Sequence, residues 1–159
     1  MSDPDWEDVT VTDPARLDEV EAQIHDCPFE PDDVRFDEPA RTLTIPFRRY
    51  GWDQERRVGG TPIRADYEFP WRRSFLRVLH ATAVRIDDRA QVGTSELLGV
   101  EYRADPPTVR LHSMPDHEVE VAVDALAVAV EHTGEVLGSG RRQAYLGMIY
   151  RADDAVHPS

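Results

Sequence analysis

The chain has 159 residues, with 31 acidic and 18 basic side chains and a formal net charge of −13. This length suits one domain with its own hydrophobic core, and a hydrophobic share of 40% argues against disorder. No apolar run approaches the roughly 20 residues that cross a bilayer, and a single cysteine excludes an internal disulfide. We therefore expect a cytoplasmic protein without membrane contact.

Lysine and asparagine do not occur in the chain. Without lysine, Schiff-base enzymes, pyridoxal-phosphate enzymes and phosphate-loop nucleotide-binding proteins are excluded. Both amino acids have codons that begin with AA, so a GC-rich genome is the simpler explanation. Adaptation of an acidic protein to a salt-rich cytoplasm is the alternative, and the two explanations are compatible.

The N-terminal third is strongly acidic, because residues 1–39 carry 14 carboxylates against two arginines. We expect residues 1–12 to be a loose acidic lead-in. A helix is predicted to begin at Asp13-Pro14, since Asp is a preferred N-cap and Pro suits the first helical position. Leu17, Val20 and Ile24 form its apolar face, and Pro28 stops it at about residue 26 or 27.

A β-hairpin is predicted after this helix. Apolar residues alternate with polar ones at 34–36 and again at 42–47, and residues 37–40 between them have turn chemistry. Pro46 cannot donate to a strand ladder, which indicates a sheet edge or a bulge. From Tyr50 to Trp71 the alternation fails, and we interpret this segment as a long connection of the kind that often carries function.

The second half of the chain shows the clearest alternation. Residues 74–86 are predicted to form one strand covered on both sides, and three runs from Leu97 onward predict a β-meander with turns at 104–107 and 113–116. The apolar parity slips at Asp124-Ala125, so a bulge or tight turn is expected there. A helix over 118–133, with Gly134 as its C-cap, is the competing interpretation, although the many valines favour strand.

The predicted fold class is therefore α+β, mainly β: an antiparallel sheet or meander with one N-terminal helix packed on it. We expect a single pleated surface in a single domain over residues 13–151, followed by a polar tail at 152–159. Gly138-Ser139-Gly140 is predicted to be a flexible joint, and 145–150 to be a last short apolar segment.

Arginine and aromatic residues concentrate between positions 48 and 73, where seven arginines face four carboxylates. Guanidinium groups bind carboxylates and phosphates, and aromatic faces supply stacking area, so this composition is typical of interaction surfaces. The candidate binding residues are Arg48, Arg49, Tyr50, Trp52, Arg56, Arg57, Trp71, Arg72 and Arg73. The alternative is structural: each arginine pairs with one of the protein's own carboxylates, and the aromatics hold the segment on the core.

The leading functional hypothesis is a non-enzymatic interaction domain that binds a protein partner or a second copy of itself through residues 48–73. An anionic small ligand is a further candidate, and the acidic N-terminal face could instead mask a basic partner. Nucleic acid is not expected, because the acidic surface repels phosphate.

The alternative is a small β-rich enzyme or ligand-binding fold with His80 and His112 in a pocket between sheet and helix. No catalytic residue, metal site or cofactor is predicted. The cluster His25-Asp26-Cys27 lacks specific metal-ligand spacing, and Cys27 follows a helix end that raises a thiol pKa.

Overall fold

The computed structural model describes residues 7–51, 54–88, 93–115 and 117–145. The strands in chain order are β1 Val9–Val11, β2 Pro28–Phe29, β3 Arg35–Asp37, β4 Thr42–Tyr50, β5 Arg56–Thr61, β6 Arg64–Val78, β7 Ala81–Asp88, β8 Ser95–Ala104, β9 Pro107–Met114, β10 His117–Val123 and β11 Val128–Tyr145. The helix α1 spans Leu17–Ile24, and two short 3-10 turns lie at Pro14–Arg16 and Pro31–Asp33.

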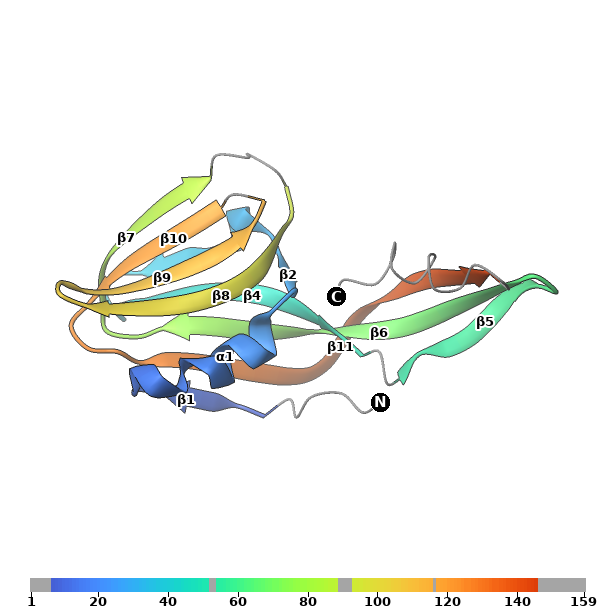
Figure 1. Cartoon of the computed structure of the whole chain (residues 1–159), viewed down its shortest axis with the longest axis horizontal. Helices are drawn as coiled ribbons and strands as arrows, with labels where there is room; N and C mark the ends of the chain where they lie inside the picture. Colours follow the sequence, from blue (N-terminus) through green and yellow to red (C-terminus); the bar gives the residue numbers. More distant parts are fainter. Residues whose placement is uncertain (1–6, 52–53, 89–92, 116, 146–159) are drawn as a thin grey trace.

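The strands form two antiparallel sheets that face each other in the body of the molecule (Figure 1). The first sheet has the order β1-β11-β6-β4-β3, with β5 added to β6, and the second has the order β2-β8-β9-β10-β7. The predicted class, mainly antiparallel β with one N-terminal helix, is confirmed. The strands divide between two sheets where the sequence led us to expect a single pleated surface.

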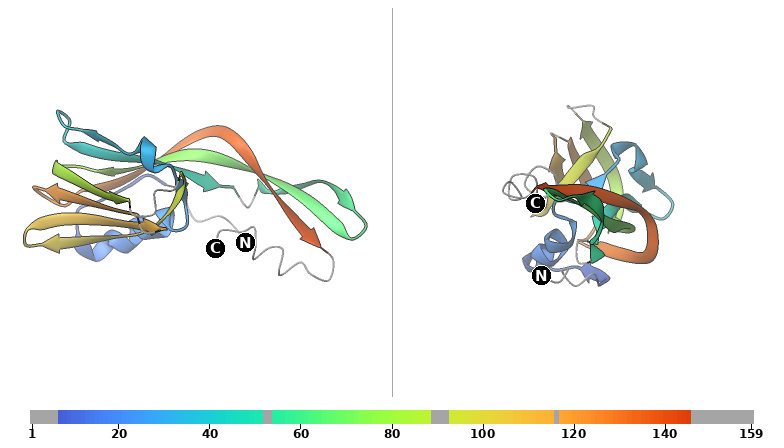
Figure 2. Two further views of the ribbon diagram at one scale, coloured as in Figure 1. Left: turned by 90° about the horizontal axis from the view of Figure 1, so that it is seen from above. Right: turned by 90° about the vertical axis from the view of Figure 1, so that its right-hand side faces the viewer.

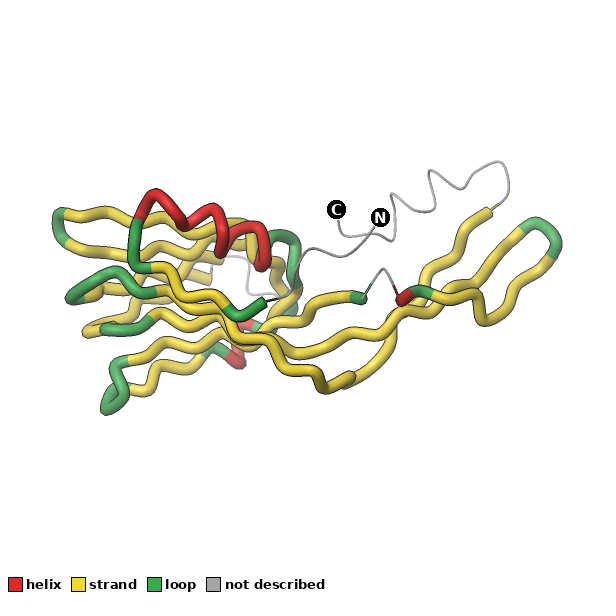
Figure 3. The backbone as a smooth tube through the Cα atoms, turned by 90° about the horizontal axis from the view of Figure 1, so that it is seen from below, coloured by secondary structure: helices red, strands yellow, loops and turns green. Residues whose placement is uncertain are grey.

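The hydrophobic core lies between the two sheets. Alternate residues of β4 and β6, including Leu43 and Leu76, point inward from the first sheet, and Val109 and Val121 point inward from the second. The helix α1 buries Leu17, Val20 and Ile24 against this core, as predicted. It lies beside β8 and β1, so it closes the side of the body between the two sheets (Figure 3).

Two sharp corners carry the chain between the sheets. The predicted single strand over 74–86 is wrong, because β6 ends at Val78, His80 takes a positive φ of 55°, and β7 begins in the other sheet at Ala81. Residues 124–127 return the chain from β10 to β11. The parity slip at Asp124-Ala125 thus marks a change of sheet, and the preference for strand over helix in 118–133 is confirmed.

Local predictions near the N-terminus are largely confirmed. The Asp13 carboxylate accepts a hydrogen bond from the Ala15 amide at 2.9 Å and caps the first turn, and β3 pairs with β4 as the predicted hairpin. The loose lead-in is wrong in part, because Val9–Val11 pair with Val128–Val130 as β1. Residues 1–6, the 146–150 segment and the 152–159 tail lie outside the described residues.

Candidate interaction surface on a projecting arm

The molecule has a long arm that extends from one end of the body (Figures 1 and 2). The arm consists of β5, residues 64–73 of β6 and residues 133–145 of β11, paired in the order β5-β6-β11. The predicted long connection at 50–71 is therefore wrong, since most of it is strand. Ten residues of β6 correspond to about 30 Å at the rise of a β-strand.

Aromatic rings lie flat across glycines of the neighbouring strand and stiffen the arm. Trp71 pairs with Gly138 and Phe69 with Gly140, and a Cβ at position 138 would lie 2.6 Å from Trp71 Nε1. A Cβ at Gly140 would collide with the Phe69 ring. The predicted flexible joint at 138–140 is therefore wrong, because these glycines make room for rings inside a strand.

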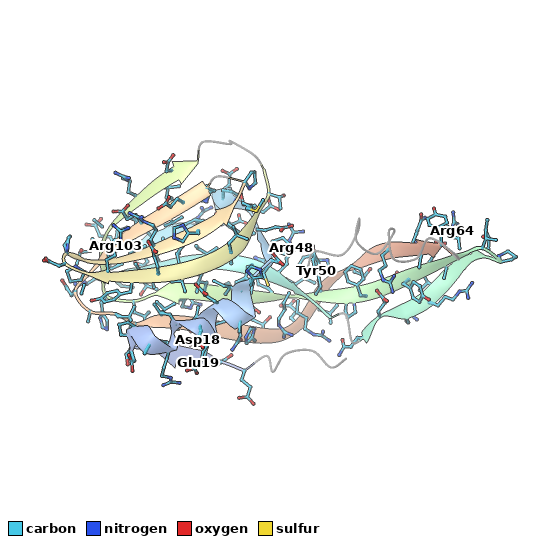
Figure 4. All side chains as sticks on the ribbon, viewed as in Figure 1. Asp18, Glu19, Arg48, Tyr50, Arg64 and Arg103 are labelled. Atoms are coloured by element: carbon cyan, nitrogen blue, oxygen red, sulfur yellow. The ribbon has the colours of Figure 1, made fainter. Side chains whose placement is uncertain are left out.

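The base of the arm holds further rings and cations. Tyr50 meets Phe69 edge-on at a centroid distance of 5.3 Å. The Arg48 guanidinium lies 5.5 Å from the Trp71 ring centroid and forms an ion pair with Glu30 at 2.7 Å. Figure 4 shows Arg48 and Tyr50 together where β4 enters the arm. These candidate residues stiffen the arm, which agrees with the structural alternative.

Burial raises the pKa of the Tyr50 hydroxyl above its ordinary value, whereas nearby Arg48 acts in the opposite direction. The phenol is therefore neutral at physiological pH. It offers an uncharged donor at the base of the arm.

Among the ion pairs that join described residues of the arm, the one between Arg142 and Glu55 is the most buried. Its Nη2–Oε1 distance is 2.6 Å, and the two side chains are only 12% and 14% exposed. Arg142 also lies 4.5 Å from the centroid of Tyr67. Sequence reasoning missed Arg142, because it follows the 48–73 cluster by some seventy positions and only strand pairing brings the two together.

The remaining candidate arginines differ in how fully they are paired. Arg56 lies 3.5 Å from Glu68 with a side chain that is 75% exposed, and Arg57 donates to the Gly59 carbonyl at 3.2 Å. The guanidinium groups of Arg72 and Arg73 make no hydrogen bond or ion pair with the described residues, although the Arg73 carbonyl accepts a hydrogen bond from Thr133 Oγ1 at 2.9 Å. Trp52 lies outside the described part of the chain.

The far end of the arm is basic and apolar. This tip, residues 56–64, contains three arginines and no carboxylate, and every residue of β5 is exposed. Ile63 is 66% exposed and Val58 is 40% exposed. Arg64 pairs with Asp66 at 3.1 Å, just behind the tip. Figure 4 places Arg64 near the far end of the arm, away from Asp18 and Glu19 on the helix of the body.

A chain of polar side chains joins four elements where the arm leaves the body. Arg49 Nε donates to Ser74 Oγ at 3.2 Å, Ser74 Oγ lies 2.6 Å from His132 Nδ1, and His132 Nε2 contacts Gln23 of α1. Because Arg49 already donates to Oγ, the Ser74 proton is directed at Nδ1, and the neutral imidazole donates from Nε2 to the Gln23 carbonyl oxygen.

Burial, reinforced by the Arg49 charge, lowers the pKa of His132 to about 4, although Asp8 acts in the opposite direction. His132 is therefore neutral at physiological pH.

The Ser74–His132 contact resembles a catalytic nucleophile with its general base, but a substrate cannot reach the Ser74 hydroxyl. Ser74 is 0% exposed. Cys27, the other nucleophile nearby, is 7% exposed and donates to the Gln23 carbonyl at 3.6 Å. Burial raises the pKa of the Cys27 thiol to about 12. Neither group can attack a substrate in this fold, so the polar chain holds the arm on the body.

The two histidines of the alternative pocket are not brought together. His80 is exposed in the corner before β7, whose Ala81 pairs with Val123 at the end of β10. His112 lies across from Glu118, near the start of β10, and its Nε2 is 3.7 Å from Glu101 on the outer face of the second sheet. The two therefore sit at opposite ends of β10.

The described residues offer neither a metal site nor a membrane-spanning helix. No group of three or more His, Cys, Asp or Glu side chains there is placed to share a metal ion. None of the helices in the same residues combines the length and apolar character that crossing a bilayer requires.

Comparison with known proteins identifies the family of the chain. A search of curated proteins and a search of solved structures found nothing similar to the chain. A family model described as "Protein of unknown function (DUF2948)" matches residues 9–144, from the start of β1 almost to the end of β11. The match includes both sheets and the arm, and the chain therefore belongs to the DUF2948 family.

Proposed function

We propose that this protein is a non-enzymatic interaction domain of the cytoplasm, whose arm tip docks on an acidic surface of a protein partner. The observation that carries the proposal is the tip itself. Arg56 and Arg57 are exposed on β5, the exposed Val58 follows them directly, the exposed Ile63 lies in the turn after β5, and residues 56–64 contain no carboxylate. Arginine beside apolar side chains is typical of the residues that dominate binding energy at protein interfaces.

The position of the tip supports the same proposal. The chain as a whole carries −13, and an acidic partner would be repelled by the body. The Debye length is about 8 Å at physiological salt, whereas the arm extends for about 30 Å. The tip therefore presents its positive charge beyond the range of the acidic body. Cys27 is a free, buried thiol, which agrees with the reducing environment of the cytoplasm.

A protein partner is favoured over nucleic acid. Three arginines neutralise few phosphates, and two of them already pair with Asp66 and Glu68. Large exposed apolar side chains such as Ile63 gain little from a phosphate backbone, whereas they can be buried in a protein surface.

The experiment replaces two arginines of the tip in one variant and two exposed arginines of the body in a control variant. Wild-type protein, Arg56→Ser/Arg57→Ser and the control Arg85→Ser/Arg103→Ser are used as bait in native cell extract at matched salt. The control is apt because the Arg85 and Arg103 side chains are 78% and 64% exposed on the body. A protein that is retained by wild type and control but not by the tip variant is then purified, and its affinity is measured by calorimetry.

We expect the tip variant to bind this purified partner at least about tenfold more weakly, since two charge-assisted contacts are lost. Duplex DNA added as competitor should leave the complex intact. Equal binding by all three baits, or displacement of the partner by DNA, would contradict the proposal. The melting temperature of the tip variant should stay unchanged, because Arg56 and Arg57 are exposed.

A further inference from the structure

The outer edge of β11 is a second surface of the arm, distinct from the tip. In the body, β1 covers this edge at Val128–Val130. From residue 131 to 145 the same strand pairs with β6 on one side only, and no described strand lies on the other (Figures 1 and 3). Such an edge presents backbone N–H and C=O groups to any strand that can lie beside it.

Charges are ordered along this edge. The acidic residues Glu131 and Glu135 come first, and the basic residues Arg141 and Arg142 come last. Glu135 is exposed, and the Arg141 side chain is 73% exposed, with only a 3.5 Å contact to Glu68. A strand that complements this order must place basic residues beside Glu131 and Glu135 and acidic residues beside Arg141 and Arg142. β11 itself does so when it runs antiparallel.

Apolar residues lie between the two charged ends. Val136 is 52% exposed and Leu137 is 37% exposed, beside the register shifts that interrupt pairing with β6. In an antiparallel pair centred on Gly138, Val136 lies opposite Gly140 of the other copy and Leu137 lies opposite Ser139. Small residues thus face the two exposed apolar side chains. The same register places Glu135 opposite Arg141 on both sides of the centre.

We propose that two copies of this chain join along the outer edges of β11, antiparallel about a twofold axis near Gly138, so that both arms form one continuous sheet. The twofold axis makes each Glu135–Arg141 contact occur twice, as an isologous interface requires. A parallel pairing would set like charges against each other. A register centred between Arg141 and Arg142 would do the same, so charge selects the register as well as the direction.

The dimer involves other residues than the tip and goes beyond the proposed function. The tip remains free to bind an acidic partner in either the monomer or the dimer. Loss of one interaction therefore leaves the other measurable.

Sedimentation velocity of the full chain tests the dimer through a charge swap. The variants are Glu135→Arg, Arg141→Glu and the double exchange, with Arg103→Glu as control. Arg103 matches Arg141 because its side chain is 64% exposed and it contacts Glu101 at 3.8 Å. Thermal melting verifies that every variant is folded.

The wild type and the Arg103→Glu control should dimerise at micromolar concentrations. Each single β11 variant should raise the dissociation constant at least about tenfold, because like charges then face each other twice. The double exchange should restore it to within about threefold of wild type. A monomeric wild type, single variants that dimerise normally, or a double exchange that stays as weak as the singles would overturn the proposal. Dimerisation abolished by the Arg56→Ser/Arg57→Ser variant alone would likewise overturn it.

Discussion

At the scale of single residues, His132 links the arm to the body. It receives the Ser74 contact on Nδ1, reaches Gln23 of α1 through Nε2, and its amide donates to Asp8 at 2.8 Å. The neutral imidazole therefore connects β6 and α1 to β11, and the backbone amide of the same residue holds Asp8 just before β1. The low pKa of about 4 has a structural reason, since a second proton would be placed in a half-buried site next to the Arg49 cation.

The low pKa of His132 predicts a pH-dependent stability. An unfolded histidine has a pKa near 6.5, so between about pH 6.5 and 4 the unfolded chain binds more protons than the folded one. The stability that His132 contributes is complete above pH 6.5 and is lost as the pH falls towards 4. After allowance for solvent screening, this loss should be about 1–2 kcal/mol.

Urea unfolding at pH 7 and pH 4.5 measures this contribution. The free energy of unfolding of His132→Gln should fall less between the two pH values than that of wild type, because Gln does not titrate. His80→Asn is the control, since His80 is exposed at a positive φ that Asn tolerates. Identical pH dependence in wild type and His132→Gln would contradict the assignment.

At the scale of elements, the arm is held together by rings over glycines and not by a shared core. Phe69 is 5% exposed against Gly140, and Trp71 lies against Gly138. A methyl group at position 140 would meet the Phe69 ring, whereas a Cβ at Gly134 of the same strand meets nothing within 4 Å. Gly140 and Gly134 therefore provide a test position and its control within the same strand.

We predict that Gly140→Ala lowers the free energy of unfolding by about 1–3 kcal/mol, because the Phe69 ring must move. Gly134→Ala should change it by less than about 0.5 kcal/mol. Chemical denaturation followed by tryptophan fluorescence gives both values. If Gly140→Ala proved as stable as Gly134→Ala, the ring would not lie across the strand as described.

The same elements show what the sequence could reveal. Strands that bury one face in the core, such as β9 and β10, alternate clearly and were predicted correctly. The arm part of β6, residues 64–73, does not face the core. Tyr67, Trp71 and Arg72 are therefore all partly exposed, and apolar residues do not alternate with polar ones in this part of the sequence. The arginine-rich segment was recognised by composition, but its strand structure and the partner Arg142 depend on pairing with β11, which no local pattern encodes.

At the scale of the whole molecule, the division into a body and an arm is also a division of charge. The body carries most of the 31 carboxylates, whereas the arm has more arginines than carboxylates and two strand edges that no described strand covers. Many of the arm's arginines form ion pairs within the molecule, with Asp66, Glu68 and Glu55 among others. Exposed groups at the tip and along β11 remain for binding. An acidic body keeps the protein hydrated and soluble, while the arm provides contact.

Hydrogen–deuterium exchange of the protein, alone and with the partner retained by its tip, tests the central claim that the arm is the contact surface. Peptides from residues 54–73 should exchange more slowly in the complex, and peptides from β8 to β10 should be unchanged. Slower exchange confined to the body, with the arm unaffected, would contradict the account.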